Sequence, residues 1–170
     1  MTGLLAGELA RAFDDEFARP IAHRSEALLE FLAIRVGAEP YALARSDLAG
    51  LFVDKRLTPL PGPGAGLLGI AAFRSVLVPV YDLRALLGID GAGPPPRWLA
   101  ATAAAPVALA FDRFERYLRV PSAAIAGTGG PGSQVRHAVC IAGETRPVID
   151  VTSLVEALRG RGRSRAEPPP

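Results

Sequence analysis

The chain has 170 residues, of which 49% are hydrophobic and 21% charged, a composition typical of one globular domain with a buried core. Its net charge is +2, but Arg159–Pro170 contributes four arginines and one glutamate, so the remaining body is close to neutral. A near-neutral body argues against nucleic-acid binding, which requires several phosphates to be neutralised at once. The single cysteine, Cys140, excludes an internal disulfide framework, and no apolar run reaches the about 20 residues that span a bilayer. We therefore expect a cytoplasmic protein without direct membrane insertion.

The first 20 residues predict an amphipathic helix. Within 3–18, one stripe recurs every four residues, and Pro20 ends the pattern. The stripe consists of Leu5, Leu9, Phe13 and Phe17. Such a helix either covers its own domain or docks on a partner, and the sequence leaves both alternatives open.

From position 28 onward, short runs of Val, Leu, Ile, Phe and Ala alternate with turn residues, which predicts an all-β barrel or sandwich. The expected strands are 29–36, 40–45, 67–74, 76–82, 97–104, 106–111, 115–120, 135–141 and 145–150. Loops rich in Gly and Pro are expected at 57–66, 88–97 and 126–134.

Two short helical segments are expected, after Asp82 and after Asp150. Each aspartate precedes a helix start, where its carboxylate can accept the unpaired amide hydrogens and face the positive end of the helix dipole. We interpret both residues as structural caps. The C-terminal helix is expected to end near 158, and the Arg- and Pro-rich tail, 159–170, to be disordered.

Parts of the chain repeat in the same order. Residues 79–83 (PVYDL) return as 147–151 (PVIDV), and 40–44 (PYALA) return as 106–110 (PVALA). An internal duplication is the simplest interpretation, and it predicts two similar halves, about 27–92 and 97–158, within one domain spanning 27–158.

Catalytic and ligand-binding patterns are weak. The string 64–69 matches G-x-G-x-x-G, but three prolines precede it and no helix is expected after it, so it does not predict a nucleotide site. His137 and Cys140 lack further partners for a metal, and Cys140 is expected to be a buried apolar residue. We therefore expect that the protein is not an enzyme and that it binds no cofactor or metal ion.

The residues of the first half carry a resemblance to a known family. Phe31–Ile34, Tyr41–Leu43, the loop 57–62 and the spaced residues of 69–83 resemble the first half of a CheW-like domain, the chemotaxis coupling module. The spaced residues are Gly69, Ala72, Arg74, Ser75, Pro79, Asp82 and Leu83. Residues 98–158 resemble the second half of the family more faintly.

The resemblance implies a fold and a function. It implies two SH3-like five-stranded β-barrels related by duplication, and a non-enzymatic adaptor that joins the cytoplasmic tip of a methyl-accepting chemoreceptor to a CheA-type histidine kinase in membrane-bound receptor arrays. It also implies that Arg74 lies near a receptor-binding groove. The groove candidates are Arg74, Phe73, Ala72, Ile70, Gly69, Leu48 and Leu51.

The chain departs from the family pattern at three positions. Ala72 replaces the usual Asn, Ser75 the usual Gly, and Gly50 an acidic residue common in the family. These changes leave open an adaptor for a pilus, gliding or other sensory array. An alternative of another class is a small β-barrel that binds RNA through its arginine tail. Four arginines without interleaved aromatic residues would bind RNA only weakly.

Overall fold

The computed structural model describes residues 28–60, 66–91, 93–127, 133–141 and 143–164, with side chains described as far as Gly160. The expected helix at 1–20 lies outside the described residues. No helix among the described residues has the length and apolarity to cross a membrane.

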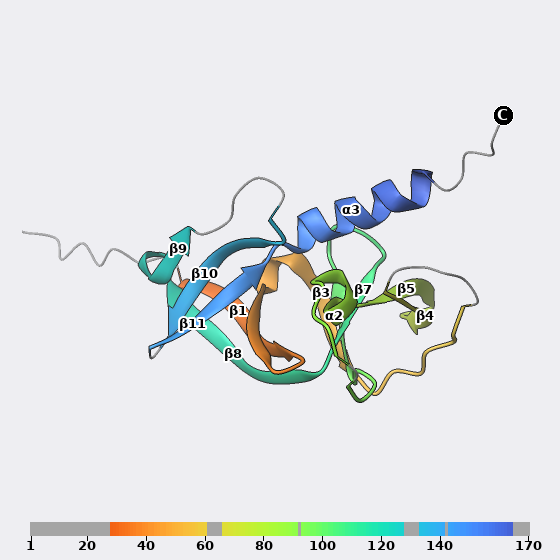
Figure 1. Cartoon of the computed structure of the whole chain (residues 1–170), viewed down its shortest axis with the longest axis horizontal. Coiled ribbons are helices and arrows are strands. Elements are labelled where there is room, and N and C mark those ends of the chain that lie inside the picture. The colour runs from red at the N-terminus through yellow and green to blue at the C-terminus, as the bar shows by residue number, and fades with distance from the viewer. Residues whose placement is uncertain (1–27, 61–65, 92, 128–132, 142, 165–170) are drawn as a thin grey trace, which may run out of the picture.

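The described residues form eleven strands in two sheets that curve into two neighbouring barrels (Figure 1). The strands are β1 (Leu28–Val36), β2 (Glu39–Ala44), β3 (Leu48–Val53), β4 (Leu67–Phe73), β5 (Val76–Asp82), β6 (Trp98–Thr102), β7 (Ala108–Phe111), β8 (Arg113–Pro121), β9 (Ile125–Gly127), β10 (Val135–Ile141) and β11 (Glu144–Ile149). The helical elements are η1 (Arg45–Asp47), α2 (Leu83–Leu86), η2 (Ser122–Ala124) and α3 (Val151–Ser164). We call the sheet β8-β1-β2-β11-β10-β9 barrel A and the sheet β3-β6-β7-β5-β4 barrel B.

The all-β prediction is confirmed, and each of the nine expected strands is present. Two strands were missed. β3 contains Gly50, which weakens the strand pattern, and β9 has only three residues. Barrel A consequently has six strands where five were expected.

The two sequence halves exchange strands, which the duplication did not reveal. Barrel A combines β1 and β2 with β8–β11, and barrel B combines β3–β5 with β6 and β7. The repeated segments meet across the halves as parallel pairs. Ala42 of β2 lies opposite Val148 of β11, and Val80 of β5 lies opposite Ala108 of β7. The duplication in the sequence did not show this exchange, because pairing partners are set by tertiary packing and not by proximity in sequence.

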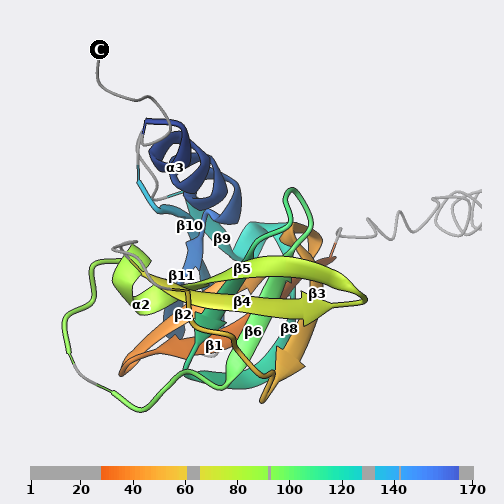
Figure 2. The same ribbon diagram turned by 90° about the vertical axis from the view of Figure 1, so that its right-hand side faces the viewer.

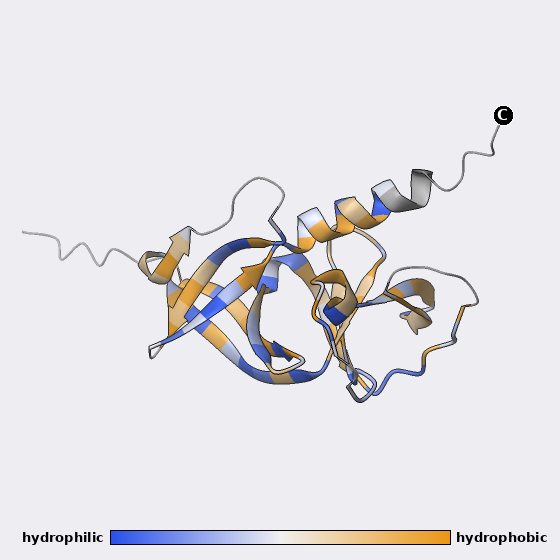
Figure 3. Ribbon diagram, viewed as in Figure 1, coloured by the Kyte–Doolittle hydropathy of each residue, from blue (hydrophilic) through white to orange (hydrophobic). Residues whose placement is uncertain are grey.

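Three apolar clusters fill the molecule. One, with Phe31 and Val139, belongs to barrel A, and another, with Phe73 and Leu99, belongs to barrel B. The third and largest is the central core, which draws on both sheets and on both helices. It contains Leu32, Ile34, Val36, Leu43, Leu48, Leu83, Leu86, Ala100, Ala105, Val107, Leu109, Phe111, Ile149, Val151, Leu154 and Val155. Figure 3 shows the apolar residues of the strands and of the first turns of α3 that form these clusters.

Each repeated aspartate connects a strand to a helix of the central core. Asp82 is the N-cap of α2, and its Oδ1 accepts a hydrogen bond from the Arg84 amide at 2.9 Å. Asp150 precedes α3, and its Oδ1 accepts from the Ser153 amide at 3.0 Å. The carboxylates satisfy amide hydrogens that a helix start leaves unpaired.

Helix α3 continues to Ser164, beyond the end expected near 158. Its first turns bury Val151, Leu154 and Val155 in the central core, which anchors the helix. Arginine is a good helix former and suits the negative end of the helix dipole, so the basic sequence extends the helix. Part of the segment predicted to be disordered is therefore helical, and 165–170 lie outside the described residues.

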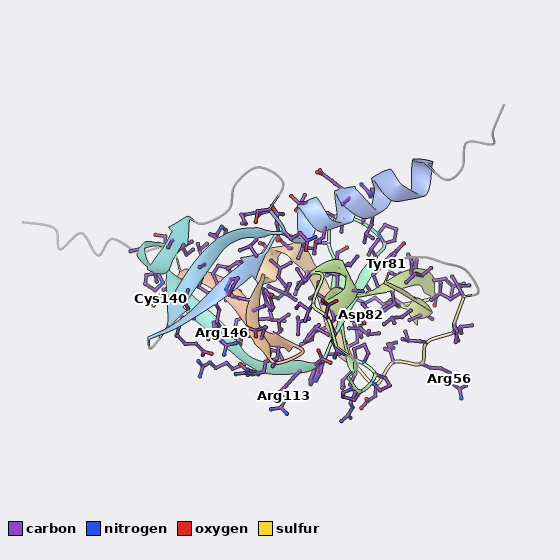
Figure 4. All side chains as sticks on the ribbon, in the orientation of Figure 1. Arg56, Tyr81, Asp82, Arg113, Cys140 and Arg146 are labelled. Atoms are coloured by element: carbon purple, nitrogen blue, oxygen red, sulfur yellow. The ribbon has the colours of Figure 1, made fainter. Side chains whose placement is uncertain are left out.

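A buried arginine joins strands of barrel A that are not neighbours in the sheet. Arg146 of β11 is only 3% exposed, and its Nη2 lies 2.6 Å from Glu115 Oε2 on β8 and 2.8 Å from Glu144 Oε2 (Figure 4). Arg35 Nε donates to Glu115 Oε1 at 2.6 Å. Burial opposes the ionisation of Glu115, but the two guanidinium groups outweigh it and hold its pKa below the usual range. The ion network therefore connects β8 to β1 and to β11.

Asp150 predicts a pH dependence of stability. Hydrogen bonds from Arg136, at 2.7 Å from Nη2 to Oδ1, lower the pKa of Asp150 from 3.8 to about 2. A carboxyl whose pKa is depressed by folding stabilises the protein above its unfolded pKa and loses that contribution as the pH falls through the folded pKa. We expect Asp150→Asn to melt below the wild type at neutral pH and the difference to vanish as the pH falls from about 4 to about 2. Melting temperatures across this range would measure it, and a difference that stays constant down to pH 2 would contradict it.

Candidate functional site

An apolar cleft lies where an edge strand of each barrel meets the other. β3 is one of the two edge strands of barrel B, and β8 is one of the two edge strands of barrel A. The cleft has a volume of about 160 Å³ and is lined by Leu32, Arg45, Leu48, Gly50, Leu51, Phe114 and Tyr117. Leu32 and Leu48 belong to the central core, so the floor of the cleft is a rigid, buried surface.

Polar groups fix the rim of this cleft. Arg45 Nη1 donates to the Leu48 carbonyl oxygen at 2.9 Å, and the Tyr117 hydroxyl donates to Glu30 Oε2 at 2.7 Å. The hydrogen bond from Tyr117 is the main cause that lowers the pKa of Glu30, and the same bond raises the pKa of Tyr117. Glu30 is thus ionised and Tyr117 protonated at neutral pH, which suits an orienting contact better than acid–base chemistry.

Gly50 has a specific place in the cleft. A Cβ built at this position would lie 2.9 Å from the Phe52 ring, which occupies the space that a side chain would need. The Phe52 ring packs against Phe73 at 4.7 Å between centroids, and Lys55 Nζ lies over both rings. Gly50 therefore leaves the cleft wall apolar at the position where the family pattern has an acidic side chain.

Arg74 lies at the tip of the β4–β5 hairpin. Arg74 and Ser75 have positive φ values of 44° and 68°, the conformation of the tight two-residue turns that suit twisted hairpins. Arg74 is exposed, and so are Val76 and Leu77, which is 66% exposed. The exposed residues Ala72, Arg74, Val76 and Leu77 form what we call the hairpin surface.

The structure separates the predicted groove residues into three places. Leu48 and Leu51 line the apolar cleft, and Ala72 and Arg74 lie on the hairpin surface. Phe73 is buried in barrel B, Gly69 is also buried, and Ile70 is half-buried in β4. Sequence reasoning missed the cleft residues Leu32, Arg45, Phe114 and Tyr117. Phe114 and Tyr117 are three residues apart, so regular alternation would place them on opposite faces of their strand. The register shift between β8 and β1, at Ala33 and Ile34, became visible only in the structure.

Gly69 has a structural role. The segment after β3 returns to β4 through an isolated bridge, in which the Thr58 amide donates to the Ile70 carbonyl at 2.8 Å and the Ile70 amide to the Thr58 carbonyl at 2.9 Å. Gly69 has a φ of 146°, and a Cβ there would collide with the backbone oxygen of Thr58. Only glycine fits this contact, which connects the segment after β3 to the β4 edge of barrel B.

Among the described residues, no group of three or more His, Cys, Asp or Glu side chains could hold a metal ion. Cys140 is exposed on β10, so the expectation of a buried cysteine is wrong (Figure 4). β10 lies next to the edge strand β9 of barrel A, and Cys140 stands near the end of the strand, beyond the buried Ala138 and Val139. Burial lowers the pKa of His137, which keeps the imidazole neutral at physiological pH.

Comparison with protein families identifies this arrangement. Residues 30–159 match the family model described as CheW-like domain. The chain belongs to the CheW-like family. A search of curated proteins gave no match.

A solved CheW structure shares the fold of this CheW-like chain. The scaffolding protein TtCheW from Thermoanaerobacter tengcongensis superposes with a TM-score of 0.68 at 18% sequence identity, covering 76% of this chain and 93% of TtCheW. The resemblance that the sequence suggested is therefore confirmed, and so is the two-barrel SH3-like architecture.

Gly69 provides a test of how barrel B is closed. We expect Gly69→Ala to lower the free energy of unfolding by about 3 kcal/mol, because the new methyl group strains the backbone and collides with Thr58. Gly127→Ala is the matched control, since a Cβ at Gly127 would meet nothing within 4 Å, and we expect a change within about 0.5 kcal/mol. Urea unfolding of the two variants would measure both values. Equal stability of the two variants would show that the Thr58–Gly69 contact is not essential.

Proposed function

We propose that this protein is a non-enzymatic adaptor that couples the cytoplasmic tip of a chemoreceptor to a CheA-type histidine kinase. It would work in the cytoplasm, at membrane-bound receptor arrays. Membership of the CheW-like family supports this proposal, and the related TtCheW is described as a scaffolding protein. The observation that carries the proposal is the rigid apolar cleft between the barrels, which offers a binding surface without catalytic groups.

The shape and chemistry of the cleft suit an amphipathic helix. Leucine and aromatic side chains line it, and such grooves accept the i, i+3, i+4 and i+7 anchors of a helix. Arg45 lies at the rim, where its guanidinium group can pair with a carboxylate of the incoming helix. We assign the receptor tip to this cleft, with Leu48 and Leu51 as apolar contacts.

An adaptor needs a second surface for its second partner. The hairpin surface is exposed, combines the apolar Val76 and Leu77 with the cationic Arg74, and none of these residues is among those that line the cleft. Exposed apolar side chains gathered in one place are typical of protein–protein contacts. We assign the kinase to Val76 and Leu77.

The two assignments can be separated by one pair of variants. We expect Leu51→Asp to reduce receptor capture at least tenfold, because a carboxylate would lose its hydration in an apolar cleft, while kinase capture stays unchanged. Leu77→Asp is the matched control and should show the opposite pattern. Pull-down with a purified receptor tip and a purified kinase regulatory domain would measure both, with melting curves to verify folding. Unchanged receptor capture by folded Leu51→Asp would contradict the cleft assignment.

The role of Arg74 stays a prediction from the family resemblance. We expect Arg74→Glu to melt like the wild type, since the side chain is exposed, and to weaken receptor capture. Arg56→Glu is a suitable control, because Arg56 is also an exposed arginine of the barrel-B surface. A loss of kinase capture alone would instead place Arg74 with Val76 and Leu77 in the kinase contact.

A further inference from the structure

A second apolar cleft lies where the described chain begins. It has a volume of about 570 Å³ and is lined by Leu28, Leu29, Glu30, Phe31, Ala44, Arg45, Ser46, Arg136 and His137. Leu28 is 57% exposed and Leu29 40% exposed, although both belong to a strand whose next residues are buried. Single exposed leucines are common, but two adjacent leucines that line one cleft indicate a surface with an occupant. We call it the β1 cleft.

The walls of the β1 cleft are preformed and basic. The Phe31 ring lies edge-on to the His137 ring, with 6.4 Å between their centroids. Arg45 and Arg136 contribute two positive charges, and Arg136 is fixed by its ion pair with Asp150 at 2.7 Å. Glu30, the one carboxylate among the described lining residues, is already held by Tyr117 and Arg119. The cleft therefore combines an apolar floor with a rim that carries the guanidinium groups of Arg45 and Arg136.

We propose that the β1 cleft is the binding site of the chain's own N-terminal segment, residues 3–18. Leu5, Leu9, Phe13 and Phe17 would supply the apolar face predicted from the sequence. The β1 cleft shares Arg45 with the cleft that we assign to the receptor, and its other lining residues are its own.

The connection along the chain favours this occupant over a separate protein. Leu28 is itself part of the cleft, and ten residues separate it from Phe17. Ten residues reach at most about 36 Å, enough for the stripe to turn back onto the cleft. A short tether also gives the segment an effective concentration on the order of millimolar, which a free partner would have to exceed.

Charge complementarity supports the same occupant. The run Asp14-Asp15-Glu16 lies between the two phenylalanines of the stripe, in the part of the segment nearest to the cleft along the chain. In the proposed arrangement these three carboxylates would lie near Arg45 and Arg136 of the rim. Opposite charges at the edge of an apolar contact set its orientation and disfavour other partners.

Hydrogen exchange of the full-length protein, measured by mass spectrometry, tests the proposal in both directions. We expect Phe13→Ala to speed exchange in 28–31, 44–46 and 136–137 about tenfold, the factor that loss of about 1.4 kcal/mol produces. Reciprocally, Leu28→Asp should speed exchange in residues 5–17. Both effects should be the same at low and high protein concentration, and the molar mass measured by light scattering should stay that of the wild type.

Two control variants make the result specific. Arg11 lies off the apolar stripe, so Arg11→Ala should leave exchange at the β1 cleft as in the wild type. Leu77 is as exposed as Leu28 but distant from this cleft, so Leu77→Asp should leave residues 5–17 unchanged. Equal exchange in Phe13→Ala and Arg11→Ala would overturn the proposal. Protection that appears only at high protein concentration would also overturn it, because the occupant would then be a second copy of the chain.

Discussion

The apolar layer between the two barrels is the contact on which the rest of the structure depends. Strands β1 and β2 of barrel A and β6 and β7 of barrel B bury one face inside their own barrel and the other in this central core. β7 is buried at all four of its positions. Such strands are apolar on both faces, which is why their sequences are continuous apolar runs and lack strict alternation. Figure 2 shows the strands of the two barrels crossing close together, with α3 lying outside them.

Strand exchange makes the two barrels one unit. Each barrel takes strands from both sequence halves, so neither half contains a complete sheet. The duplicated segments occupy equivalent positions. β2 pairs in parallel with β11, which leads into α3, and β7 pairs in parallel with β5, which leads into α2. The helices α2 and α3 then insert Leu83, Leu86, Leu154 and Val155 into the shared core. Loss of any of these contacts would therefore weaken both barrels together.

The same architecture produces the cleft that we propose as a binding surface. Two edge strands, β3 and β8, approach each other where the central core reaches the surface, and their unpaired edges leave a cleft with an apolar floor. The ion network Arg146–Glu115–Arg35 connects strands of barrel A. A protein that positions partners relative to each other benefits from this rigidity, since a fixed geometry between two surfaces lowers the conformational cost of assembling them.

Much of the local structure was determined by the sequence alone. Nine of the strands, the aspartates before the two helices and the family resemblance were visible, because strand periodicity, capping and motif spacing are properties of neighbouring residues. The partner of each strand was not visible, because pairing between halves depends on which apolar faces meet in three dimensions. For the same reason the sequence grouped Arg74 with Leu48 and Leu51, whereas the fold places Arg74 at a hairpin tip and the leucines in a cleft with Phe114 and Tyr117. The sequence determined the elements and their chemistry; the central core decided which of them lie together.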